Sequence, residues 1–413
     1  MYFQHSKNNE MKILHTADWH IGKKLHKQDL AEDFELFIQW LCQTIKEQEV
    51  DVLLVSGDVF DLANPSNEAK RQYYQSLLML KNLGLQIIIT GGNHDSPAML
   101  NAPKALLNEL NVQVFGSLPD NLAEILVPVY NAKKEVKLVV AAIPFLRNND
   151  LQSAEIAKNY EERLQNLKKG IAQYYTNAAE LAQANFPEIP CLAMGHLFAH
   201  GVSTSESERD IQIGNQAAVE ATEFGTYFKY VALGHIHKPQ QVKAEIPIHY
   251  SGSPIPLSFS EREDNKRVLL INTEENYTPI SIVVPTFRKL IKLKGNLAEI
   301  EFQLNELSEH NHLPYFIEIE VIEEKYNPQI VFMLNAIMDS FQLKGYSILK
   351  HRIQFNEQQK KLGEIAQPHQ NLNEMKVQDV FEKRLTESDL DAEQKKQLIA
   401  HFEVLLQEMN EIE

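Results

Sequence analysis

The chain has 413 residues, of which 44% are hydrophobic and 23% charged, and its formal net charge is −16 at pH 7. This length and composition are typical of a globular protein with two or three domains. The longest apolar run is far too short to cross a bilayer. The acidity argues against a protein that coats DNA by charge alone. It still allows an enzyme that contacts DNA through a local patch, through metal ions or with a partner.

The amino-terminus and the cysteines indicate the cellular compartment. Residues 1–10 are polar and lack the apolar stretch of a signal peptide, so we expect a disordered lead-in or a tag remnant there. The two cysteines, Cys42 and Cys191, lie in apolar patterns and are expected to be buried, reduced thiols. Together these features predict a cytoplasmic protein.

Short apolar segments alternate with helical patterns over the first two thirds of the chain. One helical stripe runs from Phe34 to Ile45 and another from Tyr73 to Leu83. The stretch 151–184 predicts a helical insertion. This alternation is typical of a layered α/β domain whose sheet is buried between layers. The predicted strands are Lys12–Thr16, Val52–Ser56, Gln86–Thr90, Lys137–Ile143, Pro190–Met194, Lys229–Leu233, Ile248–Tyr250 and Arg267–Asn272.

The pattern changes near Pro285. Residues 285–356 combine strand-like runs at Leu290–Leu293, Tyr315–Ile322 and Ser347–Ile353 with a helical pattern at Gln329–Phe341, which predicts a small α+β domain. Residues 357–413 begin as a polar linker and end in an acidic segment with two apolar helical stripes. Those stripes predict a helical hairpin that either packs on its own protein or docks onto a partner's helices. The expected organisation is therefore 1–10, 11–284, 285–356 and 357–413.

Polar side chains follow five of the predicted strands. Because sites in α/β proteins form at the carboxyl ends of strands, these side chains are expected to meet. Carboxylate, imidazole and amide oxygen together suit a metal ion such as Mn²⁺, Fe²⁺ or Zn²⁺. Two ions need a bridging ligand, and Asp58, in the middle of the set, is the natural bridge. The motifs are Asp18-Trp19-His20, Gly57-Asp58, Asn93-His94-Asp95, Gly195-His196 and Gly234-His235-Ile236-His237.

Each of these motifs alone is weak evidence. A single Asp-x-His or His-x-His is more often a surface or core feature than a ligand pair. The Asn93-His94-Asp95 run after two glycines could form only a turn. Buried histidines that are satisfied singly would be scattered along the chain. Five such motifs, each at the end of a predicted strand, favour a metal centre.

In this combination the motifs resemble those of the calcineurin-like metallophosphoesterases, over about residues 11–284. The resemblance implies a four-layer α/β fold, a β-sandwich flanked by helices, and two metal ions, Mn²⁺ in first place with Mg²⁺, Fe²⁺ and Zn²⁺ as alternatives. It implies that His94, oriented by Asp95, acts during in-line attack on phosphorus. The ligands it implies are Asp18, His20, Asp58 and His237 for one ion, and Asp58, Asn93, His196 and His235 for the other.

Residues around the motifs separate the branches of this superfamily. No arginine follows Asp58 closely, and Asp95 stands where phosphoprotein phosphatases carry glutamate, which argues against that branch. One residue, Asp61, replaces a histidine of archaeal and eukaryotic nucleases that helps to place phosphate, so its role stays open. The segments that resemble the double-strand-break-repair nucleases, and their bacterial SbcD family in particular, are His15–Gly22, Ser56–Asp61, Gly195–Phe198 and Tyr250–Pro254.

This second resemblance implies a DNA nuclease of repair, recombination and replication, located at the nucleoid. It would be a 3′–5′ exonuclease on double-stranded ends and an endonuclease on single strands and hairpins. It also implies a small capping domain over 285–356 and a homodimer within a two-plus-two assembly with an SbcC-type SMC ATPase. The resemblance also implies that the C-terminal hairpin binds that ATPase. ATP hydrolysis would reside in the partner, because the chain itself has no phosphate-binding Gly-x-x-x-x-Gly-Lys-Ser/Thr loop.

Two other functions stay open at this point. The chain could be a stand-alone phosphodiesterase or nucleotidase that acts on small substrates. It could also be a non-catalytic scaffold, which is disfavoured because every expected ligand position carries a competent residue. The polar loop from His200 to Asp210 follows the expected ligand His196. It either contacts a DNA backbone or is simply solvated.

Overall fold

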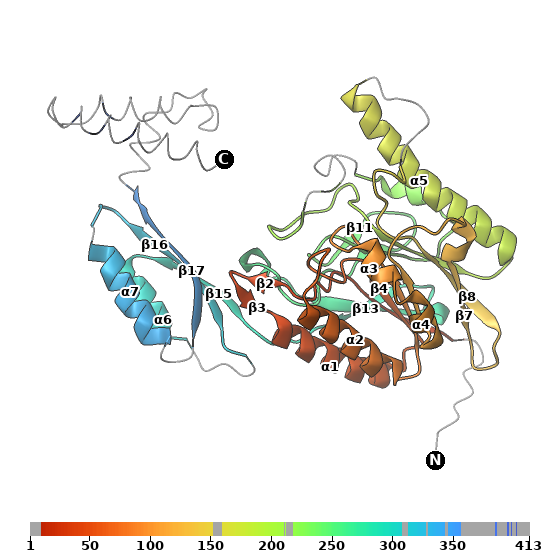
Figure 1. Ribbon diagram of the computed structural model, residues 1–413, viewed down its shortest axis with the longest axis horizontal. Coiled ribbons are helices and arrows are strands. Elements are labelled where there is room, and N and C mark those ends of the chain that lie inside the picture. The colour runs from red at the N-terminus through yellow and green to blue at the C-terminus, as the bar shows by residue number, and fades with distance from the viewer. Residues whose placement is uncertain are drawn as a thin grey trace, which may run out of the picture. The chain divides into compact units, whose positions relative to one another are not determined.

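The computed structural model of the chain describes residues 10–151, 159–209, 211, 218–307, 313–327, 329–342 and 346–356, and single residues at 385, 395, 398 and 402. By its internal contacts the chain divides into two units (Figure 1). The predicted linker and hairpin of 357–413 lie outside the described residues, as does most of the predicted lead-in, so these domain boundaries stay predictions. The first unit comprises Met1–Lys292, Ser308–Glu318 and Gln342–Lys350, and the second comprises Leu293–Leu307, Ile319–Phe341 and His351–Glu413.

The first sheet has six strands, and its central strands are buried on both faces. Strands β1, β4, β5 and β6 are parallel, while β13 and β14 are added antiparallel beyond β1. Successive residues of a strand point to opposite faces, so Leu53 and Val55 of β4 face helices whereas Val52 and Leu54 face the second sheet. In the order β14-β13-β1-β4-β5-β6 the strands are Pro279–Val283, Arg267–Asn272, Lys12–Thr16, Val52–Ser56, Gln86–Thr90 and Val112–Phe115.

The second sheet repeats this plan. Its four central strands, β12, β10, β9 and β8, are parallel, and an antiparallel strand closes each edge. Leu192 and Met194 of β9 face the first sheet, where they meet the inward residues of β4 and form an apolar layer between the sheets. In the order β11-β12-β10-β9-β8-β7 the strands are Gln240–Val242, Ile248–Tyr250, Val231–Gly234, Cys191–His196, Val136–Ala142 and Leu126–Tyr130.

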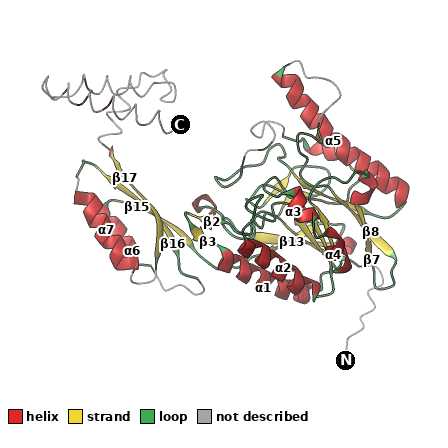
Figure 2. Ribbon diagram, in the orientation of Figure 1, coloured by secondary structure: helices red, strands yellow, loops and turns green. Residues whose placement is uncertain are grey.

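Helices cover the outer faces of the two sheets (Figure 2). Phe37 of α1 and Tyr73 of α2 are buried against the first sheet, while Ile171 and Tyr175 of α5 are buried against the second. The predicted four-layer α/β arrangement is therefore confirmed. The helices of this unit are α1 (Ala31–Gln48), α2 (Asn67–Lys81), α3 (Pro97–Asn101), α4 (Lys104–Glu109) and α5 (Tyr160–Asn185), with short 3₁₀ turns at Leu122–Ile125, Ala221–Phe224, Phe259–Glu261 and Thr273–Glu275.

The segment after Pro285 forms a three-stranded sheet with two helices. Strand order is β15-β16-β17, so the buried strand β16 is central. Helix α6, which the sequence did not predict, begins with a capping box in which Asn296 and Glu299 each accept a hydrogen bond from the other's backbone N–H. The elements are β15 (Leu290–Gly295), α6 (Leu297–Asn305), β16 (Phe316–Glu323), α7 (Gln329–Gln342) and β17 (Ser347–Phe355).

Several strands differ from the sequence prediction. The prediction missed β6, β7, β11 and β14, which are short or half-exposed, and β7 contains Pro128, which disfavours a strand assignment. It also missed the small hairpin of β2 (Lys24–Leu25) and β3 (Gln28–Asp29). Strand β9 runs on to His196, because its parallel pairing with β10 continues to that residue. Gly195 and His196 thus lie at the end of the strand rather than after it.

Both cysteines match their prediction. Cys42 in α1 and Cys191 in β9 are buried, and both are free thiols. Among the described residues, no helix combines the length and apolarity that crossing a membrane would require.

Candidate metal centre

The predicted ligand side chains come from the carboxyl ends of parallel strands in both sheets. Strands β1, β4 and β5 of the first sheet lead into Asp18 and His20, Asp58, and Asn93 and His94, respectively. In the second sheet, β9 ends in His196 and β10 leads into His235 and His237. The two sheets thus present these ends to the same place. The side chains that are buried there are Asp18, His20, Asp58, His94, Asp95, His196, His235 and His237, while Asn93 is partly exposed.

The backbone at these strand ends is bent into unusual conformations. Asp18, His20 and Asp58 have φ values of 54°, 45° and 47°, and His235 has 100°. A non-glycine residue in this region costs about 1–3 kcal/mol and persists only where its surroundings enforce it. Hydrogen bonds enforce it here: the Asp18 N–H donates to the Gly57 carbonyl across 3.1 Å, and the His20 N–H to the Asp58 carbonyl across 2.9 Å. These backbone conformations direct the side chains toward the buried centre.

Two glycines make room for the centre. A Cβ atom on Gly57 would lie 2.1 Å from Nδ1 of His196, and one on Gly92 would lie 2.1 Å from Oδ1 of Asp58. Gly57 also has a φ of +81°, which favours glycine. These two residues therefore let the ligand-bearing loops of both sheets approach closely.

Three histidines present the same nitrogen to the centre. Nδ1 of His20 donates to Asp61 Oδ1 (3.2 Å), Nδ1 of His196 to the Ser56 carbonyl (3.2 Å), and Nδ1 of His237 contacts Ser207 Oγ (2.6 Å). A proton on Nδ1 leaves the lone pair on Nε2. Nε2 is thus the atom that each ring offers to a metal ion, and the outer hydrogen bond fixes that choice.

The first predicted ligand group is compact. Nε2 of His20 lies 3.1 Å from Nε2 of His237 and 3.5 Å from Oδ2 of Asp58. Two imidazole nitrogens that bind one ion at about 2.0–2.1 Å lie about 3 Å apart. The separation of the two rings therefore fits a shared ion. Ligand atoms of Asp18, His20 and His237 all lie within 4.8 Å of one another.

The second predicted group shares Asp58 with the first. Nε2 of His196 lies 3.3 Å from Asp58 Oδ2 and 2.8 Å from the side-chain oxygen of Asn93. The ring of His235 lies 5.4 Å from that of His196. One oxygen of Asp58 is therefore close to the offered nitrogens of both groups, which is the geometry of a bridging carboxylate.

Two buried atoms at the centre have no protein partner. Oδ2 of Asp18 and Nε2 of His235 are inaccessible to solvent, and neither has a hydrogen-bond partner among the described residues. A buried polar atom without a partner is costly, on the order of 1–3 kcal/mol. A divalent cation would satisfy both atoms, so the residues present fit a metal ion.

The charges of the centre also favour a bound metal ion. Burial, aided by the neighbouring Asp58, raises the pKa of Asp18 to about 7, although His196 opposes this. Burial would also raise the pKa of Asp58, but His196 and His20 hold it well below its usual range. Burial would lower the pKa of His196, but Asp58 and Asp18 raise it to about 9. Two buried carboxylates thus demand positive charge, which a metal ion would supply.

His94 lies beside the first group, where a nitrogen of its ring and ligand atoms of His20 and Asp58 all lie within 4.8 Å of one another. Its backbone N–H donates to Asp58 Oδ1 (2.9 Å), its Nδ1 donates to the Asp61 carbonyl (2.7 Å), and its ring lies 4.7 Å from that of His20. Burial lowers the pKa of His94 to about 4, although the carboxylate of Asp58 opposes this. The ring is therefore neutral near pH 7, with Nε2 unprotonated.

The partners of Asp95 differ from the sequence prediction, which had Asp95 orient His94. The carboxylate of Asp95 accepts backbone N–H groups from Gly92 (2.8 Å), Val59 (3.0 Å) and Phe60 (2.9 Å). These hydrogen bonds join the loop after β5 to the loop after β4. The His94 ring itself is oriented by its hydrogen bond to the Asp61 carbonyl. Asp95 thus acts on His94 only through the backbone.

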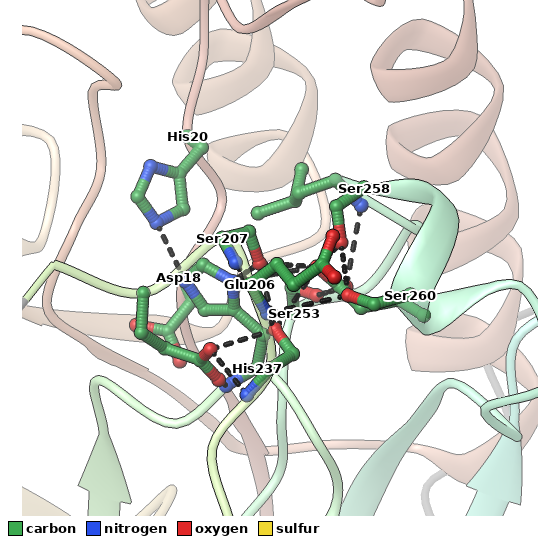
Figure 3. A network of polar contacts seen from close by, with 12 residues as sticks. Asp18, His20, Glu206, Ser207, His237, Ser253, Ser258 and Ser260 are labelled. Atoms are coloured by element: carbon green, nitrogen blue, oxygen red, sulfur yellow. Dashed lines mark hydrogen bonds and ion pairs between the residues drawn. The ribbon is translucent and has the colours of Figure 1, made fainter. Parts of the chain in front are cut away.

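The sequence did not indicate that Asp61 and Ser207 contact the outer nitrogens of predicted ligand histidines. Asp61 contacts His20 and is itself paired with Lys23 at 3.1 Å. Ser207 contacts His237 within a network of serines and carboxylates (Figure 3). No spacing marks either contact, because each joins residues that are at least 30 positions apart in the sequence.

The comparisons with known proteins agree with this geometry. Residues 11–239, more than half of the chain, match the family model described as calcineurin-like phosphoesterase, so the chain is a metal-dependent hydrolase of this class. Residues 286–389 match the model described as type 5 capsule protein repressor C-terminal domain.

Relatives from several bacteria show to which family within this class the chain belongs. The chain is 32% identical to the D subunit of the nuclease SbcCD of Escherichia coli (strain K12) over 94% of its length and 96% of that protein. It is 36% identical to the Rhodobacter capsulatus protein of the same name over 68% of its length and 71% of that protein, and 30% identical to the Bacillus subtilis one over 75% and 79%. The chain belongs to the family of SbcCD nuclease D subunits. The predicted resemblance to the SbcD family, and the nuclease class that it implied, are confirmed.

Proposed function

We propose that the chain cleaves phosphodiester bonds of DNA at a centre for two divalent ions, Mn²⁺ in first place. The observation that carries this proposal is the position of Asp58. Its Oδ2 lies 3.5 Å from the offered nitrogen of His20 and 3.3 Å from that of His196, so one carboxylate can serve two ions. The mixture of oxygen and imidazole ligands suits manganese.

Residues would divide between the ions as follows. Asp58 is shared, and the unpartnered atoms of Asp18 and His235 each complete one set. When bound, the ions would supply an activated water molecule and neutralise charge on the phosphate. The first ion would be held by Asp18, His20, Asp58 and His237, and the second by Asp58, Asn93, His196 and His235.

His94 would act on the phosphate or on the leaving oxygen. Because Nδ1 donates to the Asp61 carbonyl, Nε2 is the atom that is left to exchange a proton or a hydrogen bond with substrate. An anionic phosphate would raise the pKa of this neutral imidazole, so that Nε2 first takes up a proton from water and then donates that proton to the leaving oxygen. Asp95 holds the two loops that place this ring.

DNA as substrate, an SMC-type ATPase as partner and a homodimer complete the proposal. The relatives are named as one subunit of a nuclease, which supports both a nucleic-acid substrate and a partner. The ATPase would add basic surface for duplex DNA, which this acidic chain has little of. Helix α2 exposes Tyr74 and Leu78, four residues apart on one face, and Leu78 is 52% exposed. That face suits contact with a second copy, and residues 371–413 would dock the ATPase.

A cleavage assay tests the proposal. The purified chain, with Mn²⁺ and with or without the ATPase and ATP, is incubated with end-labelled blunt duplex DNA and hairpin DNA. We expect metal-dependent cleavage that the ATPase stimulates. Good hydrolysis of cyclic or mononucleotides, with duplex DNA left intact even when ATPase and ATP are present, would instead identify a small-substrate phosphodiesterase. A chain lacking residues 371–413 should keep cleavage of a model diester and lose co-purification with the ATPase.

A further inference from the structure

The predicted ligand His237 is held by three segments that are distant in sequence. Its backbone N–H donates to Glu208 Oε1 across 2.8 Å. Its carbonyl accepts from Lys266 Nζ across 3.0 Å and from the Ser253 N–H across 3.1 Å. With Nδ1 on Ser207, the other polar groups of His237 all have partners in these segments, while Nε2 faces Nε2 of His20 at 3.1 Å. Figure 3 shows Ser207, Ser253 and His20 around His237.

The hydroxyl of Ser207 has three polar neighbours, which are His237 Nδ1, Glu261 Oε1 and Ser205 Oγ, the last at 2.8 Å. Oγ of Ser207 lies 2.6 Å from His237 Nδ1 and forms a short hydrogen bond with Glu261 Oε1. An ionised carboxylate only accepts, so the serine hydroxyl must donate its single proton to Glu261. The hydroxyl oxygen then accepts from His237, which places the ring proton on Nδ1 and the lone pair on Nε2.

The partners of Glu261 stabilise its ionised carboxylate. Its side chain is fully buried, and its other oxygen accepts from Lys266 Nζ (2.6 Å), from Ser253 Oγ (3.2 Å) and from the Leu257 N–H (3.2 Å). Lys266 is itself only 5% exposed, so the pair is a desolvated ion pair in contact with the ligand loop.

The glycine before Ser253 permits this arrangement. Gly252 has a φ of +79°, and a Cβ atom there would lie 2.6 Å from the His237 carbonyl oxygen. The segment can approach His237 this closely only because residue 252 has no side chain. The Tyr250–Pro254 segment, which the sequence indicated only through its resemblance to the nuclease family, thus packs against the main chain of His237.

From these contacts we infer that Ser207 and Glu261 are positioning residues for His237 and set the affinity of one of the two metal positions. This inference rests on the proposed metal centre. A carboxylate behind a histidine ligand orients the ring and raises its basicity, and loss of such a partner costs about 10–100-fold in metal affinity. Here the carboxylate acts through a serine hydroxyl supplied by the loop that follows His200.

Metal titration of the purified full chain tests the inference. Mn²⁺ is added to metal-free protein, and binding is followed by calorimetry and by competition with a chromophoric chelator. The Ser207→Ala chain should bind one of its two ions about 10–100-fold more weakly, and the other as the unaltered chain does. The Ser207→Thr chain, which keeps a hydroxyl, should recover much of the loss. Ser203→Ala removes a hydroxyl of the same loop that contacts Gln240 instead, and should change nothing.

The outcomes separate this inference from the proposed function. If the unaltered chain binds no Mn²⁺, the proposed metal centre fails. If it binds two ions and Ser207→Ala binds both equally well, only the positioning role fails. An equal loss in Ser203→Ala would also overturn that role. Glu261→Gln should weaken the same ion as Ser207→Ala. Because it leaves Lys266 without its counter-charge, melting of the metal-free chain is measured alongside, and a loss of affinity confined to an unfolded fraction counts against the inference.

Discussion

The carbonyl oxygen of Asp61 accepts a hydrogen bond from Nδ1 of His94 across 2.7 Å, while the carboxylate of the same residue accepts one from Nδ1 of His20 across 3.2 Å. One residue therefore fixes the ring proton of a predicted metal ligand and of a predicted catalytic histidine. The first contact is made by the main chain and the second by the side chain. Substitution of Asp61 removes only the second, which lets the two roles be tested apart.

Replacement of the catalytic ring should abolish cleavage and spare the metal centre. We expect His94→Ala to lower the turnover number for DNA about 10²–10⁴-fold, the range for loss of a general acid or base. Mn²⁺ titration should be unchanged, because the ring nitrogens of His94 are outside the proposed ligand sets. His200→Ala, at an exposed histidine paired with Glu220, is the control. Normal cleavage by His94→Ala would rule out the assignment.

Replacement of Asp61 should give the opposite pattern. Asp61→Ala removes the carboxylate behind His20 and should weaken Mn²⁺ binding about 10–100-fold. Because the carbonyl that holds His94 remains, cleavage should recover at saturating Mn²⁺, whereas that of His94→Ala should not. Cleavage is measured as a function of Mn²⁺ concentration, with the exposed Asp120→Ala as control. An Asp61→Ala chain that stays inactive at saturating Mn²⁺ would contradict this separation.

The sequence was enough to predict the proposed ligands but indicated little about the residues that hold them. Asp18, Asp58 and His196 each lie at the end of an apolar strand. The strand pattern and the residue type together indicated that they are candidate ligands. Ser207 lies in a loop and Glu261 in a short 3₁₀ turn. Neither segment has a periodicity that marks these residues, and they meet only in the folded chain. The same reason explains the short edge strands that were missed, since their pairing partners and not their own residues make them strands.

A buried ion pair outside the centre should be essential for stability. Arg288 donates from Nε to Asp33 of α1 across 3.0 Å and from Nη1 to the Pro314 carbonyl across 2.9 Å, and its guanidinium lies 4.1 Å from the Phe316 ring centroid. Removal of one partner leaves a buried charge unpaired, which costs about 3–5 kcal/mol. We expect Arg288→Met to lower the free energy of unfolding in urea by that amount.

The control for this pair is an exposed one. Arg71 pairs with Glu68 three residues earlier on α2, and both side chains are 61% exposed. Such pairs contribute little, so Arg71→Met should change the free energy of unfolding by less than about 0.5 kcal/mol. Equal effects of the two substitutions would refute the importance of the Arg288 pair.

His15 should make the fold sensitive to acid. It is fully buried between the sheets with Nδ1 3.0 Å from the Tyr230 hydroxyl, and burial lowers its pKa to about 3. Unfolded, it takes up a proton below about pH 6.5, while the folded chain does not. Stability is therefore intact above that pH and is lost as pH falls from 6.5 toward 3, by up to about 1.4 kcal/mol per pH unit. His15→Leu should show a shallower fall than the unaltered chain in urea unfolding at several pH values, and His200→Gln should not.

Arg209 should contact the phosphate backbone of the substrate. It is exposed and directly follows Glu208, whose carboxylate accepts the His237 N–H across 2.8 Å, and its charge helps to lower the pKa of His94. A guanidinium so near the centre suits a phosphate beside the one that is cleaved. We expect Arg209→Ala to raise the KM for duplex DNA, with little change in turnover number, and to reduce the salt dependence of binding by about one ion. Lys243→Ala, an exposed cation on the turn between β11 and β12, is the matched control. An unaltered salt dependence in Arg209→Ala would show that the loop after His200 is only solvated, and that the contacts to DNA come from elsewhere.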